Sequence, residues 1–162
     1  MNVGEATLIK NILGFGILWV IFLLYACTDD GLSKEEEIKQ FIEAGIEAAE
    51  NRSAKDLSEL IDENYLDDRK FNKKQLTTLV QLYFFRHKNI FLFTKIDEIE
   101  FFTDNEALIT LYVAMAGSAI SSANVLTSLR AKTYKFELEL IKQDKWLLQR
   151  AKWQGISVSD MQ

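Results

Sequence analysis

The sequence predicts an α+β fold in which three N-terminal helices pack on a strongly curved antiparallel sheet. Two observations lead to this prediction. Apolar residues recur every three or four positions before Asn89, which is helical spacing, whereas after Asn89 they alternate with polar residues, which is strand spacing. The alternating segments are longer than the usual strand of roughly five or six residues, so the sheet has to bend. A bent sheet that closes over a helix forms a cone with an apolar mouth, which favours a binding cavity.

The first two helices are indicated by side chains that can cap their amino ends. Ser33 followed by Glu36 reads as a capping box, in which each side chain satisfies a backbone amide at the helix start. An apolar stripe then runs from Ile38 to Ala49. Ser53 begins a second, short helix.

An acidic connection over residues 62–70 leads to the third helix. Its acids lack the order of a calcium-binding loop, so we expect a solvated loop rather than a cation site. Asn72 is expected to cap the third helix, which should end near His87. The acids are Asp62, Glu63, Asp67 and Asp68, and the buried face of the helix is expected to hold Leu76, Leu79, Val80, Tyr83 and Phe84.

The remaining chain reads as two antiparallel hairpins, joined by a loop or short helix over residues 117–128. Alternation is plainest in the third strand, where one face is apolar and aromatic and the other is charged. Its apolar face holds Tyr134, Phe136, Leu138 and Leu140, and its charged face holds Lys135, Glu137 and Glu139. The four expected strands cover residues 90–102, 106–116, 129–141 and 146–154.

Composition excludes several functional classes. A net charge of −5 without a basic block argues against nucleic acid as a partner, because Lys and Arg must replace the counterions of the phosphates. The single Cys excludes an internal disulfide and any cysteine-rich metal site, and the single His excludes most His-based metal sites. We therefore expect neither a cofactor nor a metal centre.

The N-terminus carries the features of a signal peptide. Lys10 precedes an apolar run over residues 12–27 that reaches about 24 Å as a helix, short of the roughly 30 Å hydrocarbon core of a bilayer. The run ends in Leu24-Tyr25-Ala26-Cys27, which resembles the lipobox of bacterial lipoproteins, although Tyr25 is bulkier than the usual small residue. The alternative is an uncleaved N-terminal membrane helix in which Cys27 is a passive apolar residue.

The lipobox resemblance implies four segments: a signal peptide at 1–26, a lipidated tether at 27–32, a domain at 33–154 and a tail at 155–162. It also implies acyl chains on Cys27, which would anchor the chain to a membrane of the bacterial cell envelope, facing the periplasm. Thr28, rather than Asp, follows the cysteine, which by resemblance favours the outer membrane over the inner one.

The order of elements is similar to the nuclear-transport-factor-2-like superfamily, also called the cystatin-like cone. Several stretches also resemble an uncharacterised proteobacterial group of that superfamily, and the resemblance as a whole covers about residues 33–154. The resemblance implies the cone fold but no single reaction, because the superfamily includes isomerases, cyclases, dehydratases and non-catalytic domains. The stretches are 83–87, 96–99, 113–117, 129–136 and 145–148, with Trp153.

Catalysis in such a cone needs a base in an apolar pocket. His87 and Asp97 are the only candidates, and both are weak. The favoured interpretation of His87 is a helix C-cap between two cations, and that of Asp97 is part of a solvated strand face. We therefore assign no catalytic residue. Five residues are candidates to line a pocket, although the aromatic ones among them could simply be core: Tyr65, Tyr83, Tyr134, Arg150 and Trp153.

Three functions follow from these expectations. The first is a non-catalytic domain of an envelope lipoprotein that binds a small apolar ligand or a partner protein. The second is an isomerase-, cyclase- or dehydratase-like enzyme with a carboxylate base in the cone. The third is an envelope assembly or structural factor that acts as a homodimer and has an exposed apolar patch.

Overall fold

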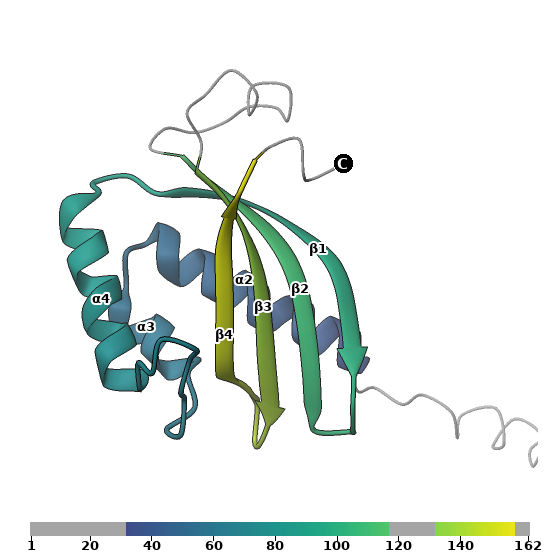
Figure 1. The fold of residues 1–162 in the computed structure, drawn as a ribbon. Helices are drawn as coiled ribbons and strands as arrows, with labels where there is room; N and C mark the ends of the chain where they lie inside the picture. Colours follow the sequence, from purple (N-terminus) through teal and green to yellow (C-terminus); the bar gives the residue numbers. More distant parts are fainter. Residues whose placement is uncertain (1–31, 117–131, 158–162) are drawn as a thin grey trace, which may run out of the picture. The chain divides into compact units, whose positions relative to one another are not determined.

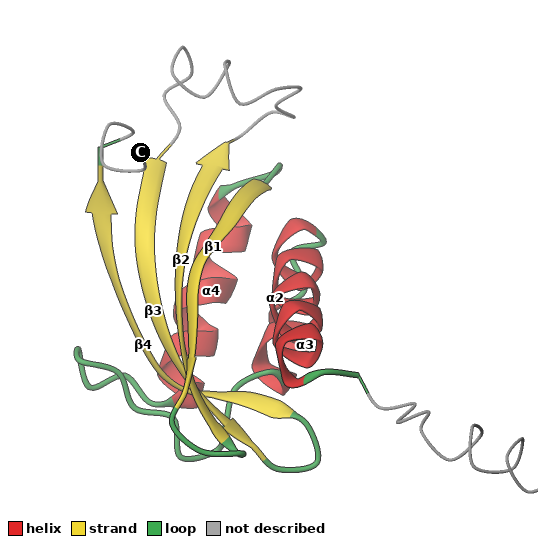
Figure 2. Cartoon of the chain, turned by 90° about the vertical axis from the view of Figure 1, so that its right-hand side faces the viewer, coloured by secondary structure: helices red, strands yellow, loops and turns green. Residues whose placement is uncertain are grey.

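Three helices lie on one face of a curved four-stranded sheet in the computed structural model (Figures 1 and 2). The structure describes residues 32–116 and 132–157. The predicted signal peptide and Cys27 fall outside these residues, as do the segment 117–131 and most of the tail. The elements are α2 (Lys34–Glu50), α3 (Ala54–Glu59), α4 (Lys73–Arg86), β1 (Phe91–Phe101), β2 (Glu106–Ala116), β3 (Lys132–Lys142) and β4 (Trp146–Ile156).

The sheet is an antiparallel meander in the order β1-β2-β3-β4, as the alternating pattern predicts. The predicted bounds of β2 are those observed. β4 runs two residues beyond its predicted end, because Gly155 and Ile156 still pair with Tyr134 and Thr133. The register shifts between Ile96 and Glu98 and again in the β3–β4 pair, and such bulges help a long sheet to curve.

Capping side chains start all three helices where the sequence predicts. The Ser33 and Ser53 hydroxyls each accept a hydrogen bond, at 3.2 Å, from the amide three residues later. The full capping box, however, forms at Asn72, whose side chain and that of Gln75 each accept from the other's backbone amide at 3.0 Å. At Ser33 the Glu36 carboxylate pairs with Lys39 at 3.2 Å, so the expected box is only half formed there.

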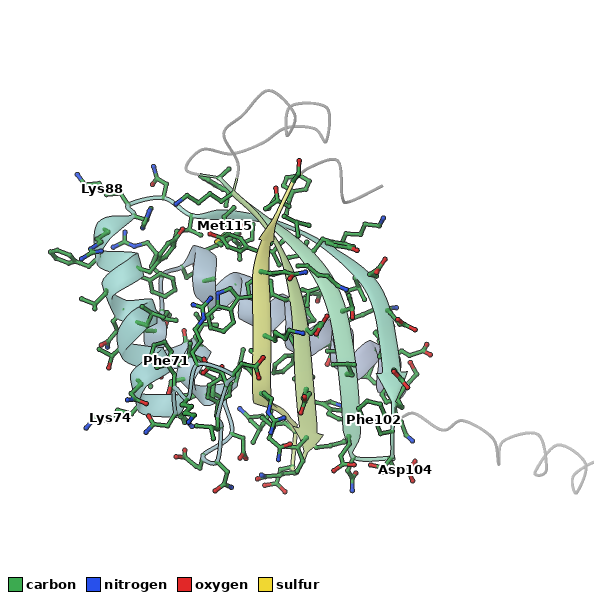
Figure 3. The ribbon with its side chains drawn as sticks, viewed as in Figure 1. Phe71, Lys74, Lys88, Phe102, Asp104 and Met115 are labelled. Atoms are coloured by element: carbon green, nitrogen blue, oxygen red, sulfur yellow. The ribbon has the colours of Figure 1, made fainter. Side chains whose placement is uncertain are left out.

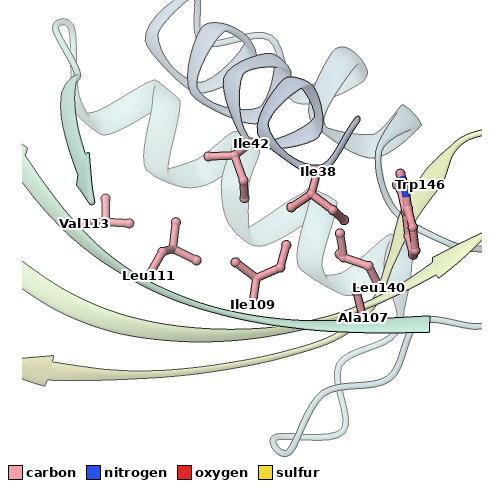
Figure 4. Packing of buried hydrophobic residues seen from close by; sticks show 8 residues of the cluster. All are labelled: Ile38, Ile42, Ala107, Ile109, Leu111, Val113, Leu140 and Trp146. Atoms are coloured by element: carbon pink, nitrogen blue, oxygen red, sulfur yellow. The ribbon is translucent and has the colours of Figure 1, made fainter. Parts of the chain in front are cut away.

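The main core lies between α2 and the concave face of the sheet (Figure 4). Every second residue of β2 faces α2, and these side chains meet two isoleucines one helical turn apart. Burial of this apolar surface is the main force that holds α2 on the sheet. The buried members are Ile38, Ile42, Ala107, Ile109, Leu111, Val113, Leu140 and Trp146.

Glu37 fastens the first turn of α2 to the β3–β4 hairpin. Its Oε2 accepts hydrogen bonds from Lys142 Nζ at 2.6 Å and Trp146 Nε1 at 2.9 Å. These bonds, that of Lys142 above all, lower the pKa of Glu37 below its ordinary value of 4.5. The stabilisation is therefore present above that value and is lost as the pH falls through the lower pKa of the folded state.

The acidic connection between α3 and α4 is not a solvated loop, which corrects the prediction for two of its four acids. Asp62 and Asp67 are only 3% and 4% exposed. Asp62 accepts hydrogen bonds from the Asn64 amide and the Gln143 side chain, both at 2.8 Å. These carboxylates are structural acceptors. Among the described residues, no group of three potential metal-ligating side chains comes together.

Candidate ligand-binding cavity

A cavity of about 250 Å³ lies between the helices and the sheet. Of the seventeen described residues that line it, sixteen are apolar and Thr94 alone has a polar side chain. The helices contribute Phe41, Ile42, Gly45, Ile46, Leu57, Leu76 and Val80, and Leu60 and Ile61 follow α3. The strands contribute Leu92, Thr94, Leu111, Val113, Met115, Phe136, Leu138 and Leu148.

Alternation along the strands explains which sheet residues reach the cavity. Side chains two positions apart share a face of a strand, and the lining residues of β1, β2 and β3 each obey this spacing. On α2, Gly45 leaves space where a larger side chain would project. A methyl group added there would lie 3.9 Å from Leu60 Cδ1, an ordinary contact.

The lining can hold apolar matter but offers little chemistry. Among the described residues around the cavity there is no carboxylate, imidazole, amine, guanidinium, thiol or phenol. The hydroxyl in the described lining belongs to Thr94, and an alcohol is a weak acid and a weak base. General acid–base catalysis needs a group that exchanges protons near neutral pH.

The two weak catalytic candidates lie elsewhere. Asp97 is exposed at the bulge of β1, which agrees with the solvated interpretation. His87 is exposed at the end of α4, where its backbone amide donates to the Tyr83 carbonyl at 3.1 Å. Its ring stacks on the Tyr83 ring with centroids 4.0 Å apart. The structure therefore places His87 as a helix C-cap and brings it together with Tyr83 rather than with Asp97.

None of the five predicted pocket residues is among the side chains that line this cavity. Tyr65 is buried in a separate cluster with Ile61 and Ala151, and its hydroxyl donates to Asp67 Oδ2 at 3.4 Å. Burial is the main cause that raises the pKa of Tyr65. Arg150 is exposed and pairs with Glu139 at 3.7 Å.

The other three aromatic candidates support the lining from behind. Tyr134 and Trp153 flank Phe136, which does line the cavity, with ring centroids 6.2 Å away on each side. The Tyr83 hydroxyl donates to the sulfur of Met115, another lining residue, at 3.9 Å. Burial raises the pKa of Tyr83. These rings fix the shape of the wall without forming its surface.

Comparisons with known proteins identify the fold. No protein-family model matches this chain, and no curated protein matches it by sequence. Bd1075 of Bdellovibrio bacteriovorus is similar in structure, with a TM-score of 0.58 and 16% identity over 78% of this chain. This chain spans only 44% of Bd1075.

Two further structures match over most of their own length. A domain of unknown function with a cystatin-like fold from Nostoc punctiforme has a TM-score of 0.61 and 16% identity, over 83% of each chain. A protein from Novosphingobium aromaticivorans, provisionally named a scytalone dehydratase, has a TM-score of 0.64 and 11% identity, over 76% of this chain and 85% of its own. The described domain thus has the cystatin-like α+β fold of the nuclear-transport-factor-2-like proteins.

Proposed function

We propose that this chain is an envelope lipoprotein whose domain binds a small apolar ligand in the cavity without transforming it. The observation that carries the proposal is the lining itself, which is apolar except for Thr94. An engineered apolar cavity of about 150 Å³ is known to hold benzene. A cavity of about 250 Å³ therefore suits a single ring system or a short hydrocarbon chain.

An enzyme of the dehydratase class fits the cavity less well. The Novosphingobium protein suggests this alternative, because it is named a dehydratase and the two chains share a fold. The fold does not transfer the reaction, since function depends on the groups in the site. The described lining provides no base, and both weak candidates, His87 and Asp97, are exposed outside it.

Filling the cavity should abolish binding. We expect saturating indole, an apolar probe, to raise the unfolding temperature of the full chain, because a ligand that binds only the native state stabilises it. Gly45→Leu should place a side chain in the cavity and remove this shift. Gly45→Ala is the matched control: it gains about 0.5–1 kcal/mol of helix stability and still responds to indole. An equal shift in Gly45→Leu, or none in the natural chain, would refute binding in this cavity.

The membrane anchor is the second part of the proposal. It rests on the lipobox-like Leu24-Tyr25-Ala26-Cys27. Among residues 32–116 and 132–157, no helix is both long and apolar enough to cross a membrane. Cys27→Ala should abolish labelling by a radioactive fatty acid and release the domain from the membrane fraction or leave it as an unprocessed precursor. The matched control is Thr28→Ser, which keeps the acyl acceptor. Retention of Met1 in the natural chain, without acylation, would rule the anchor out.

A further inference from the structure

The outer face of α4 carries large apolar side chains that no residue within 32–116 or 132–157 covers. Phe85 is 86% exposed and Leu82 is 51% exposed, and Leu79, predicted to be buried, is 42% exposed. Leu76, Val80, Tyr83 and Phe84 already fill the inner face, so the helix presents apolar groups on both sides. A contiguous exposed apolar surface of this kind marks an interaction site more often than an isolated residue does.

The chain around this surface has an unusual charge. Residues 69–96 contain seven Lys and Arg and no acid, in a protein whose net charge is −5. The rest of the chain therefore carries −12. Lys73 is paired with Glu63 at 2.6 Å, whereas Lys74, Arg86 and Lys88 lie on or beside α4. Charges of one sign on one surface steer oppositely charged partners towards it.

Three of these cations surround the apolar side chains. Lys74 lies near the start of α4 and Arg86 at its end, about 18 Å apart along the axis. Lys88 follows the helix, and Figure 3 shows Lys74 and Lys88 at its two ends. All three are exposed, and none forms an ion pair with any side chain in the described ranges. An apolar centre with a rim of unpaired cations is the arrangement of a protein interface.

The exposed charges around α4 indicate the chemistry of the occupant. Lys74, Arg86 and Lys88 are exposed cations without an ion-pair partner among the described residues, so they fit an occupant whose rim supplies carboxylates. Phe85 and Leu82 between them fit an occupant whose centre is apolar.

We propose that the outer face of α4, defined here by Lys74, Leu82, Phe85 and Arg86, docks a partner protein whose surface is apolar at its centre and acidic at its rim. Phe85 and Leu82 anchor the contact by desolvation, and Lys74 and Arg86 orient it by pairing with carboxylates. A second copy joined through the same face is disfavoured, because its cations would oppose one another.

Site-specific photo-crosslinking in the cells that produce the protein tests this proposal. A photoreactive phenylalanine analogue replaces Phe85 or, as the matched control, Phe102, which is 56% exposed beside the acids of the β1–β2 turn. We expect a discrete protein adduct at position 85 and none at 102. The adduct yield should fall at least about tenfold in the Leu82→Glu variant, and also in a double variant that combines Lys74→Glu and Arg86→Glu. Lys145→Glu, at an exposed site outside the α4 face, should leave it unchanged.

The crosslinked peptide of the partner must itself be acidic. Absence of an adduct at 85, equal adducts at 85 and 102, or insensitivity to the charge reversals would overturn the proposal. An adduct of twice the mass of the chain would assign the face to self-association, and an adduct with lipid would assign it to a membrane; both would also overturn it. Leu82, Lys74 and Arg86 are exposed, so we expect their variants to fold. Melting curves check this. The result is independent of whether indole binds the cavity.

Discussion

Trp146→Ala should destabilise the domain by about 3–5 kcal/mol, the range for removing a large buried aromatic side chain. Trp146 is 4% exposed at the start of β4, where it belongs to the main core and lies 6.2 Å, centroid to centroid, from Phe101. Alanine leaves a cavity and also removes the indole N–H that donates to Glu37. Urea unfolding of the full chain, followed by circular dichroism, measures the loss.

Two further variants separate packing from hydrogen bonding. Trp146→Phe keeps most of the apolar volume but loses the bond to Glu37, so it should cost much less than alanine. Trp153→Ala also deletes an indole, but from a half-buried position between Phe136 and the Arg69 guanidinium, 4.4 Å from the ring. If Trp146→Ala and Trp153→Ala cost the same, the main core is not centred where Figure 4 places it.

Asp67→Ala should destabilise the domain by about 3 kcal/mol, because it leaves one buried hydroxyl and two part-buried amides without their acceptor. Asp67 Oδ1 accepts hydrogen bonds from the amides of Arg69 and Phe71 at 2.9 and 2.8 Å, and Oδ2 accepts from the Tyr65 hydroxyl. The adjoining Lys70 adopts a positive φ of 63°, so the turn depends on this carboxylate to hold a conformation that lysine rarely takes.

Asp67→Asn is the informative control. Its amide oxygen can still accept from the two backbone amides, and its NH₂ can donate to the Tyr65 oxygen, so the loss should be no more than about 1 kcal/mol. Asp68→Ala, at the exposed neighbour, should be within about 0.5 kcal/mol of the natural chain. If Asp68→Ala and Asp67→Ala lowered the free energy of unfolding equally, the negative charge of the loop, and not the buried hydrogen bonds of Asp67, would stabilise the loop.

The sequence predicts features that depend on neighbouring residues, and it misses those that depend on contacts between distant residues. Helix starts depend on groups three residues apart, so Ser33, Ser53 and Asn72 were identifiable as caps. The burial of Asp62 depends on Gln143, 81 positions away, and no local pattern shows that contact. Leu79 has helical spacing, but the inner face of α4 was already full, so the residue faces solvent.

The cavity residues were missed for a different reason. Prediction favoured aromatic and charged side chains as pocket walls, whereas the wall consists mainly of aliphatic residues such as Leu92, Val113 and Leu138. Strand alternation predicted only Leu138 on an apolar face, although Leu92 and Val113 obey the same two-residue spacing along β1 and β2. Which inward residues border empty space, rather than one another, depends on how far the sheet curves, and periodicity does not measure curvature.

The meander order has a consequence for how the domain assembles. Each strand pairs only with strands adjacent to it in the chain, so the hairpins require short loop closures. Contact between Ile38 and Ile109, in contrast, closes a loop of about seventy residues, which costs more entropy. We expect the hairpins to form early and α2 to dock late. The cavity comes into existence only at that final step, and a ligand that fills it would slow unfolding by holding α2 in place.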